Sequence, residues 1–261
     1  MLKTSRLLHR LASVATLAIA ASLAPAARAA AIVWGSPTTL GGDTDVITTG
    51  TLVSAYNLGV DGGATTVNGV VFQNMQNPDY GSPSWSFGSG AGAVSLAGTS
   101  LLSGNPFEVG LSPYSLLSSD YRALLGSALW NDNSISTEVT VTLGGLTAGE
   151  TYYIQFWTND PRSYGVNRDT TFTATASTVL EQNTGTGYGG LGQWVLGTFT
   201  ADSSTQVIFA SGTGSGSHAT MINALQLRSA SAIPEPATTA TFAGGLVLGA
   251  ALLWRRRRRA A

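Results

Sequence analysis

The chain has 261 residues, of which 32 are glycine and none is cysteine, so disulfides, thiolate metal sites and a cysteine nucleophile are excluded. The formal net charge is −1, but nine of the 13 basic residues fall in the first 28 or the last seven positions. Residues 31–230 keep four arginines against 13 carboxylates, a net charge of −9. An acidic body without lysine repels nucleic acid, which excludes nucleic-acid binding.

The amino terminus has the three parts of a secretory signal peptide. Basic residues precede an apolar run at residues 11–23, and Ala-Arg-Ala at 27–29 has the form of a signal-peptidase site. We therefore expect residues 1–30 to be a signal helix that signal peptidase removes, and residues 31–230 to be the folded domain. An uncleaved membrane anchor is the alternative.

Two acidic loops offer oxygen ligands for a hard cation. Asp43 and Asp45 are separated by one residue, and Asp132 stands between Asn131 and Asn133. Carboxylate and amide oxygens are the ligands that calcium prefers, so we predict a structural calcium ion at these positions. The alternative is that these residues serve only as turn formers, which Asp and Asn commonly are.

One segment, "SSDYRALLGSALW" at residues 118–130, has the spacing of a helix. Ser118 or Ser119 stands where a side chain can cap the first turn, and Asp120 is favourable near the positive helix end. We predict one short helix packed against the rest of the domain. Its apolar stripe would consist of Tyr121, Leu124, Leu125, Ala128 and Leu129.

Alternation of apolar and polar residues predicts strands in most of the body. "TEVTVTL" and "TYYIQFW" each have one apolar face, and "GGLTAGE" between them supplies glycines for a tight connection. We therefore predict an antiparallel hairpin over residues 137–157. Its inward face would bury Val139, Val141, Tyr152, Ile154 and Phe156.

Six further segments alternate in the same way, and Gly and Asn punctuate them. Strands at this spacing predict an all-β fold, an antiparallel β-sandwich with one short helix. The segments lie at residues 45–56, 67–73, 171–176, 193–200, 205–210 and 222–228.

Three stretches in the second half carry a resemblance to a known fold. "VTLGGLTAGETYYIQFWTND", "GQWVLGTFTADSSTQVIFAS" and the closing "INALQLR" resemble, in pattern and strand order, the C-terminal half of galactose-binding-like jelly rolls over about 90 residues. The resemblance implies a jelly-roll sandwich and says more about fold than about function.

The segment "FWTNDPRSYGVNRD" gathers residue types that bind sugars. Aromatic rings can stack on sugar rings, while amide, carboxylate and guanidinium groups bond to hydroxyls. Ring packing inside the sandwich is the alternative. The predicted glycan-binding residues are Trp157, Tyr164 and Tyr188, with Tyr80 and Trp85 as further rings, and Asn159, Asp160, Arg162 and Asn167 as polar partners.

The sequence does not favour catalysis. His218 is the one imidazole left after the leader, and no G-x-S-x-G nucleophile elbow accompanies it. The acidic residues form no recognisable pair for glycoside hydrolysis. We therefore expect a protein that is not an enzyme.

The carboxyl terminus has three ordered elements. Pro234, Glu235 and Pro236 precede an uncharged run at residues 237–254, which is just long enough to span a bilayer. A basic cluster follows and would stay in the cytoplasm, namely Arg255, Arg256, Arg257, Arg258 and Arg259.

This arrangement, over residues 231–261, resembles the PEP-CTERM sorting signal of Gram-negative bacteria. The resemblance implies export, transient residence in the inner membrane through a C-terminal transmembrane helix, and processing by an exosortase. The mature protein would then reach the cell surface or the extracellular space. We therefore expect a non-enzymatic protein of the cell envelope or extracellular matrix. The alternative is a carbohydrate-binding module acting on exopolysaccharide, and a more distant one is a glycan-active enzyme.

Overall fold

The computed structural model describes residues 30–59, 63–75, 81–104, 107, 109–131, 138–214 and 220–230. Within these residues β-strands dominate, and the helical elements are one α-helix and three short 3-10 helices. The predicted cleavage site, the proline motif and the membrane helix at 237–254 lie outside the described residues. None of the described helices is long and apolar enough to span a membrane.

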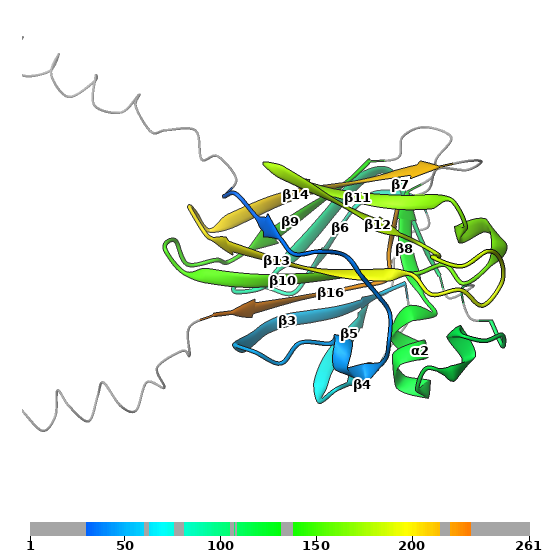
Figure 1. The fold of residues 1–261 in the computed structure, drawn as a ribbon. Helices are drawn as coiled ribbons and strands as arrows, with labels where there is room; N and C mark the ends of the chain where they lie inside the picture. The colour runs from blue at the N-terminus through cyan, green and yellow to red at the C-terminus, as the bar shows by residue number, and fades with distance from the viewer. Residues whose placement is uncertain are drawn as a thin grey trace, which may run out of the picture.

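The strands form two sheets that face each other, as predicted for an all-β sandwich (Figure 1). Sheet A has, in spatial order, β1 (Val33–Trp34), β13 (Gln193–Thr200), β10 (Thr151–Thr158), β16 (Ala224–Ser229), β3 (Thr51–Leu58), β5 (Val70–Met75) and β4 (Ala64–Val67), with β2 (Thr38–Thr39) also on β13. Sheet B has β12 (Ala176–Glu181), β11 (Arg168–Ala174), β14 (Thr205–Gly214), β9 (Glu138–Gly144), β7 (Val94–Gly104), β8 (Ala128–Asn131) and β15 (Met221–Ile222), with β6 (Ser82–Phe87) also on β7.

From β9 onward the chain alternates between the two sheets. β9 lies in sheet B, β10 in sheet A, β11 and β12 in sheet B, β13 in sheet A, β14 in sheet B and β16 in sheet A. Their ladders are antiparallel. The alternation places the β10–β11 and β12–β13 loops at one end of the sandwich, because each crosses between the sheets where β10 ends and β13 begins.

The predicted hairpin over residues 137–157 is wrong in its pairing. β9 pairs with β14 and β7, whereas β10 pairs with β13 and β16 in the opposite sheet. Residues 145–150 cross between the sheets, which stand about 10 Å apart, instead of making a tight turn. The predicted inward face is nevertheless confirmed, since all five of its residues are buried: Val139, Val141, Tyr152, Ile154 and Phe156.

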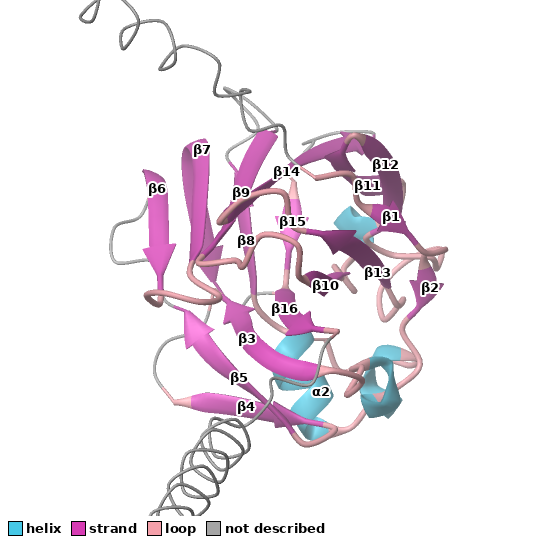
Figure 2. Cartoon of the chain, turned by 90° about the vertical axis from the view of Figure 1, so that its left-hand side faces the viewer, coloured by secondary structure: helices cyan, strands magenta, loops and turns pink. Residues whose placement is uncertain are grey.

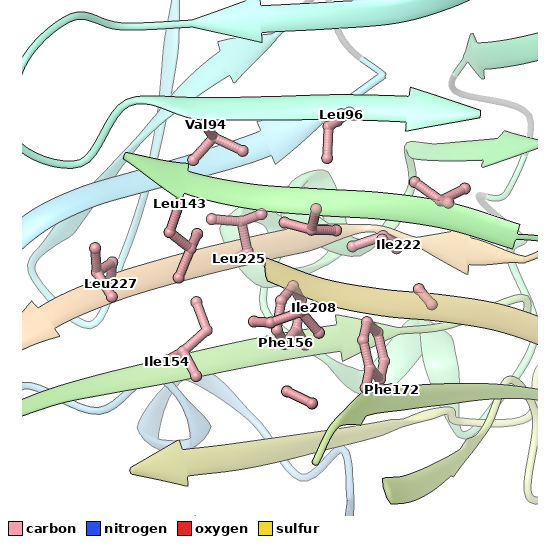
Figure 3. Close-up of a cluster of buried hydrophobic side chains, with 14 of the residues drawn as sticks. Val94, Leu96, Leu143, Ile154, Phe156, Phe172, Ile208, Ile222, Leu225 and Leu227 are labelled. Carbon is pink, nitrogen blue, oxygen red and sulfur yellow. The ribbon is translucent and has the colours of Figure 1, made fainter. Parts of the chain in front are cut away.

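The main core fills the space between the sheets. Phe156 from sheet A and Phe172 from sheet B stack with ring centroids 4.4 Å apart. Figure 3 shows them among aliphatic side chains from both sheets, including Ile154, Leu225 and Ile208. Such a ring pair adds about 0.5–1.5 kcal/mol beyond the area it buries. The core thus fixes the strands that carry the two crossing loops.

The predicted helix is confirmed in type and cap but is shorter than the pattern suggested. α2 (Ser119–Leu125) starts after Ser118, whose side chain accepts from the backbone N of Tyr121. It ends at Gly126, so Ala128 and Leu129 belong to β8 instead. α2 lies beside sheet A (Figure 2), where a second apolar cluster joins it to the outer face of the sheet.

Candidate functional site

Two loops meet at one end of the sandwich and form the candidate site. Residues 159–167 lead from β10 to β11, and residues 182–192 lead from β12 to β13. The backbone N of Asp160 donates to the carbonyl of Gln182 at 2.7 Å, which joins the loops directly. Loops that are anchored to each other in this way can hold side chains in fixed positions.

Asn183 is the centre of this junction. Its side chain is buried, and its Nδ2 lies within hydrogen-bonding distance of the carbonyls of Asp160, Arg162 and Gly187, at 3.1, 3.2 and 3.0 Å. Its Oδ1 accepts from the backbone N of Gly185 at 2.9 Å. One amide therefore connects both loops, a role that sequence analysis did not predict because it depends on contacts across the fold.

Asp160 and Arg162 form an ion pair inside the first loop. Nε and Nη2 of Arg162 donate to the two carboxylate oxygens of Asp160 at 2.8 and 2.9 Å, and the backbone N of Arg162 adds a third bond at 3.1 Å. The guanidinium also lies over the ring of Phe107, 4.4 Å from its centroid. Bidentate pairing of this kind satisfies both charges with hydrogen bonds.

Tyr164 presents an exposed ring beside this pair. Its exposed fraction is 61%, and the guanidinium carbons of Arg162 and Arg168 lie 5.7 and 5.8 Å from its ring centroid. These distances are within the range of cation–π attraction. Two of the four arginines of the acidic body thus flank one surface tyrosine.

Arg168, unlike Arg162, has no counter-ion within the part of the chain that the structure describes. It is the first residue of β11 and only 9% exposed, and its Nε is buried without a hydrogen-bond partner. Among the described residues no carboxylate makes an ion pair with it. Burial lowers the pKa of the Arg168 guanidinium, an effect that the negative charge of Asp160 opposes.

A cavity of about 640 Å³ opens between the start of β11 and the second loop. Asp169 and Glu181 are direct cross-strand partners, and burial raises the pKa of Asp169. The lining thus combines one cation, two carboxyl groups, amides and short apolar side chains: Val166, Asn167, Arg168, Asp169, Val179, Glu181, Asn183, Thr184 and Gly185.

Several predicted glycan-binding residues turn out to be internal. Trp157 is fully buried against Phe72 on the outer face of sheet A, so its ring cannot stack on a ligand. Asn159 and Asp160 are also fully buried. The Oδ1 of Asn159 accepts from a loop amide at 2.8 Å, so both residues position the loops instead of contacting solvent.

The remaining predicted glycan-binding residues differ in their exposure to solvent. Tyr164 and Tyr188 are exposed, the latter at 57%, and Arg162 is partly exposed. Asn167 is exposed and lines the cavity. Trp85 is buried, and Tyr80 lies outside the described residues.

Two of the predicted calcium ligands, Asp43 and Asp45, accept hydrogen bonds from the protein itself. Oδ1 of Asp43 accepts from Ser118 at 2.5 Å, and Oδ2 of Asp45 accepts from the hydroxyl of Tyr121 at 2.9 Å and from the backbone N of Gly41 at 2.7 Å. A cation would have to displace these donors, so the turn-forming alternative fits better. Asp132 lies outside the described residues, which contain no group of three or more potential ligands.

The residues that sequence analysis missed are Arg168, Asp169, Glu181 and Asn183. Arg168 and Asp169 stand at the end of the "FWTNDPRSYGVNRD" segment, so proximity to the predicted tyrosine was a usable signal. Glu181 and Asn183 become relevant only through the pairing of β11 with β12. The proline motif 234–236, the arginine cluster 255–259 and His218 lie outside the described residues.

The fold and the site define an all-β sandwich with a polar cavity at its loop end. No protein-family profile matches the chain, and no curated protein matches it either. Among solved structures, the chain is similar to the ANX1 ectodomain from Arabidopsis thaliana, with 14% identity and a TM-score of 0.41 over 71% of this chain. The match spans 52% of that ectodomain, about half of its length.

Proposed function

We propose that the chain is an exported, non-enzymatic protein of the cell envelope or extracellular matrix that binds exopolysaccharide at the cavity between its two crossing loops. The observation that carries this proposal is the position of Tyr164. Its ring is exposed, it contacts Arg168, and Arg168 lines the cavity.

The chemistry of the cavity suits a sugar. The faces of pyranose rings are apolar and stack on aromatic rings, while their hydroxyls need both donors and acceptors. Tyr164, beside the lining residue Arg168, offers the ring. Asn167 and Thr184 in the lining offer donors and acceptors, and the carboxylates of Asp169 and Glu181 accept from hydroxyls. Tyr188 is a second exposed ring, on the neighbouring loop.

The order of the strands supports a jelly-roll assignment. Alternation between opposing sheets from β9 to β16 is the connectivity expected of a jelly roll and agrees with the resemblance to galactose-binding-like domains. Because unrelated functions share such folds, this supports the architecture and leaves the ligand to the chemistry of the site.

Export and sorting are part of the same proposal. The signal peptide at 1–30 would direct secretion, and Pro234, Glu235 and Pro236 would be presented to an exosortase while residues 237–254 hold the chain in the inner membrane. One epitope tag within residues 215–217 and another after Ala261 test this. Exported material should keep the first tag and lose the second, and both should remain at the inner membrane in a strain without the exosortase. Exported protein that carries both tags would contradict processing.

Glycan binding is tested on immobilised polysaccharides, both neutral and acidic. The wild-type protein should bind at least one of them, and Tyr164→Ala should weaken that binding about tenfold, the effect of losing roughly 1.4 kcal/mol of ring contact. Phe209→Ala is the matched control, because it removes an exposed ring from β14 in sheet B. Absence of binding to any polysaccharide, or equal binding by Tyr164→Ala, would contradict the proposal.

A further inference from the structure

We infer that the glycan is acidic and that a uronate carboxylate of one of its sugars pairs with Arg168. This inference rests on the proposed function and specifies the class of its ligand.

Arg162 and Arg168 lie at nearly equal distances from Tyr164 but differ in their counter-ions. Arg162 is paired through two bonds with Asp160. Arg168 is more deeply buried, and its side chain has no hydrogen bond or ion pair with any described residue. A buried charge is unfavourable unless an opposite charge accompanies it. An anion that enters beside Arg168 would supply the charge that the described residues do not.

The neighbouring carboxylates restrict what that anion can be. Arg168 and Asp169 are consecutive in β11, and Glu181 is the cross-strand partner of Asp169. All three residues line the cavity, so its lining has a cationic part, Arg168, and an anionic part, Asp169 and Glu181. The carboxylates of Asp169 and Glu181 would repel a ligand that carries more than one negative charge per sugar, such as a highly sulfated polymer.

A uronic acid matches this division of charge. It carries a single carboxylate, which a guanidinium can bind through two parallel hydrogen bonds, and several hydroxyls, which can donate to Asp169 and Glu181. Its ring face can stack on Tyr164. A neutral sugar would bond to Asp169 and Glu181 and stack on the ring, but it would leave Arg168 without a counter-ion among the described residues.

The test compares polygalacturonate with its carboxyl-reduced form, which has the same backbone but a hydroxymethyl group in place of each carboxylate. The full-length protein, solubilised in mild detergent, should bind polygalacturonate about 10- to 100-fold more tightly than the reduced polymer, the range expected for a charged hydrogen-bonded pair. Arg168→Gln should abolish this preference. Because the substitution removes an unpaired buried charge, its melting temperature should not fall.

Arg122→Gln is the matched control, because it removes the same charge from α2. It should keep the preference for polygalacturonate. Equal binding of both polymers, or an undiminished preference in Arg168→Gln, would overturn the inference while leaving glycan binding in place. An equal loss in Arg122→Gln would attribute the preference to overall charge and also overturn it. Failure to bind any polysaccharide would overturn the inference and the proposed function together.

Discussion

The indole nitrogen of Trp157 donates a hydrogen bond to the hydroxyl of Tyr121 at 3.1 Å, and this bond joins the centre of sheet A to α2. The Tyr121 hydroxyl in turn donates to Oδ2 of Asp45 at 2.9 Å. Three residues that are far apart in the chain thus form one hydrogen-bonded relay, which is buried at Trp157 and Tyr121 and partly exposed at Asp45. Its members include a residue that sequence analysis predicted to bind sugar and one predicted to bind calcium.

Tyr121→Phe should therefore destabilise the protein by about 1–3 kcal/mol, because it leaves the Trp157 nitrogen without its acceptor and removes one of the donors to Asp45. Urea unfolding followed by tryptophan fluorescence measures this. Tyr153→Phe, on the half-buried face of β10, is the control and should change the free energy of unfolding by less than about 0.5 kcal/mol. Equal effects of the two substitutions would show that the relay does not stabilise the fold.

The buried hydroxyl of Tyr121 should also make the stability of the protein depend on pH. Burial, with the charge of Asp45 as a second cause, raises the pKa of Tyr121 well above its ordinary value of 10.0. Its contribution to stability is fully present below pH 10.0 and is lost as pH rises toward the raised pKa, because only the unfolded chain ionises there. Between pH 10.0 and the raised pKa, the free energy of unfolding should fall less steeply with pH in Tyr121→Phe than in the wild type. The difference in slope should be up to about 1.4 kcal/mol per pH unit. Identical slopes would contradict this.

Two glycines of the second loop make a matched pair for testing the loop junction. A Cβ at position 190 would clash with the side-chain amide of Asn183, whereas a Cβ at position 187 would meet nothing within 4 Å. Gly190→Ala should thus destabilise the protein by about 1–3 kcal/mol and weaken glycan binding, since Asn183 holds both loops. Gly187→Ala should leave both properties unchanged. Thermal unfolding together with polysaccharide binding checks the pair, and a tolerated Gly190→Ala would refute the role of Asn183.

Substitutions of Trp157 and Tyr164 should separate effects on protein stability from effects on glycan binding. Trp157→Ala removes a fully buried ring and should cost about 3–5 kcal/mol of stability. Tyr164→Ala removes an exposed ring and should change the free energy of unfolding by less than about 0.5 kcal/mol while weakening glycan binding. Denaturant titrations of the two variants measure the difference. Comparable destabilisation by both would mean that Tyr164 belongs to the core.

The strands and their inward faces could be predicted because alternation depends only on neighbouring residues. β13, for example, has the predicted bounds, and Val139, Val141 and Phe156 are buried as expected. Which strands pair could not be predicted, since β9 and β10 each have one apolar face and fit two opposing sheets as well as one hairpin. Periodicity cannot distinguish these arrangements.

The site was predictable only in part for a related reason. Trp157 lies on the face of β10 opposite to Phe156, a face that alternation assigns to solvent. α2 and the segment around Asp45 cover that face, so the ring is buried and the indole finds its partner there. The exposed Tyr164 was identified correctly as a surface ring. The proposed role of Arg168 in binding depends on the absence of a counter-ion among the described residues, which no sequence pattern reveals.

The most direct test of the central claim is to map where a sugar binds. Backbone NMR spectra should be recorded while a short galacturonate oligosaccharide is added to the protein. The largest shifts should occur in residues 162–169 and 181–185, with little change in β3, β4 and β5 at the far edge of sheet A. Shifts that centre on the outer face of either sheet, and that leave Tyr164 and Arg168 unchanged, would contradict a glycan site at the loop end of this sandwich.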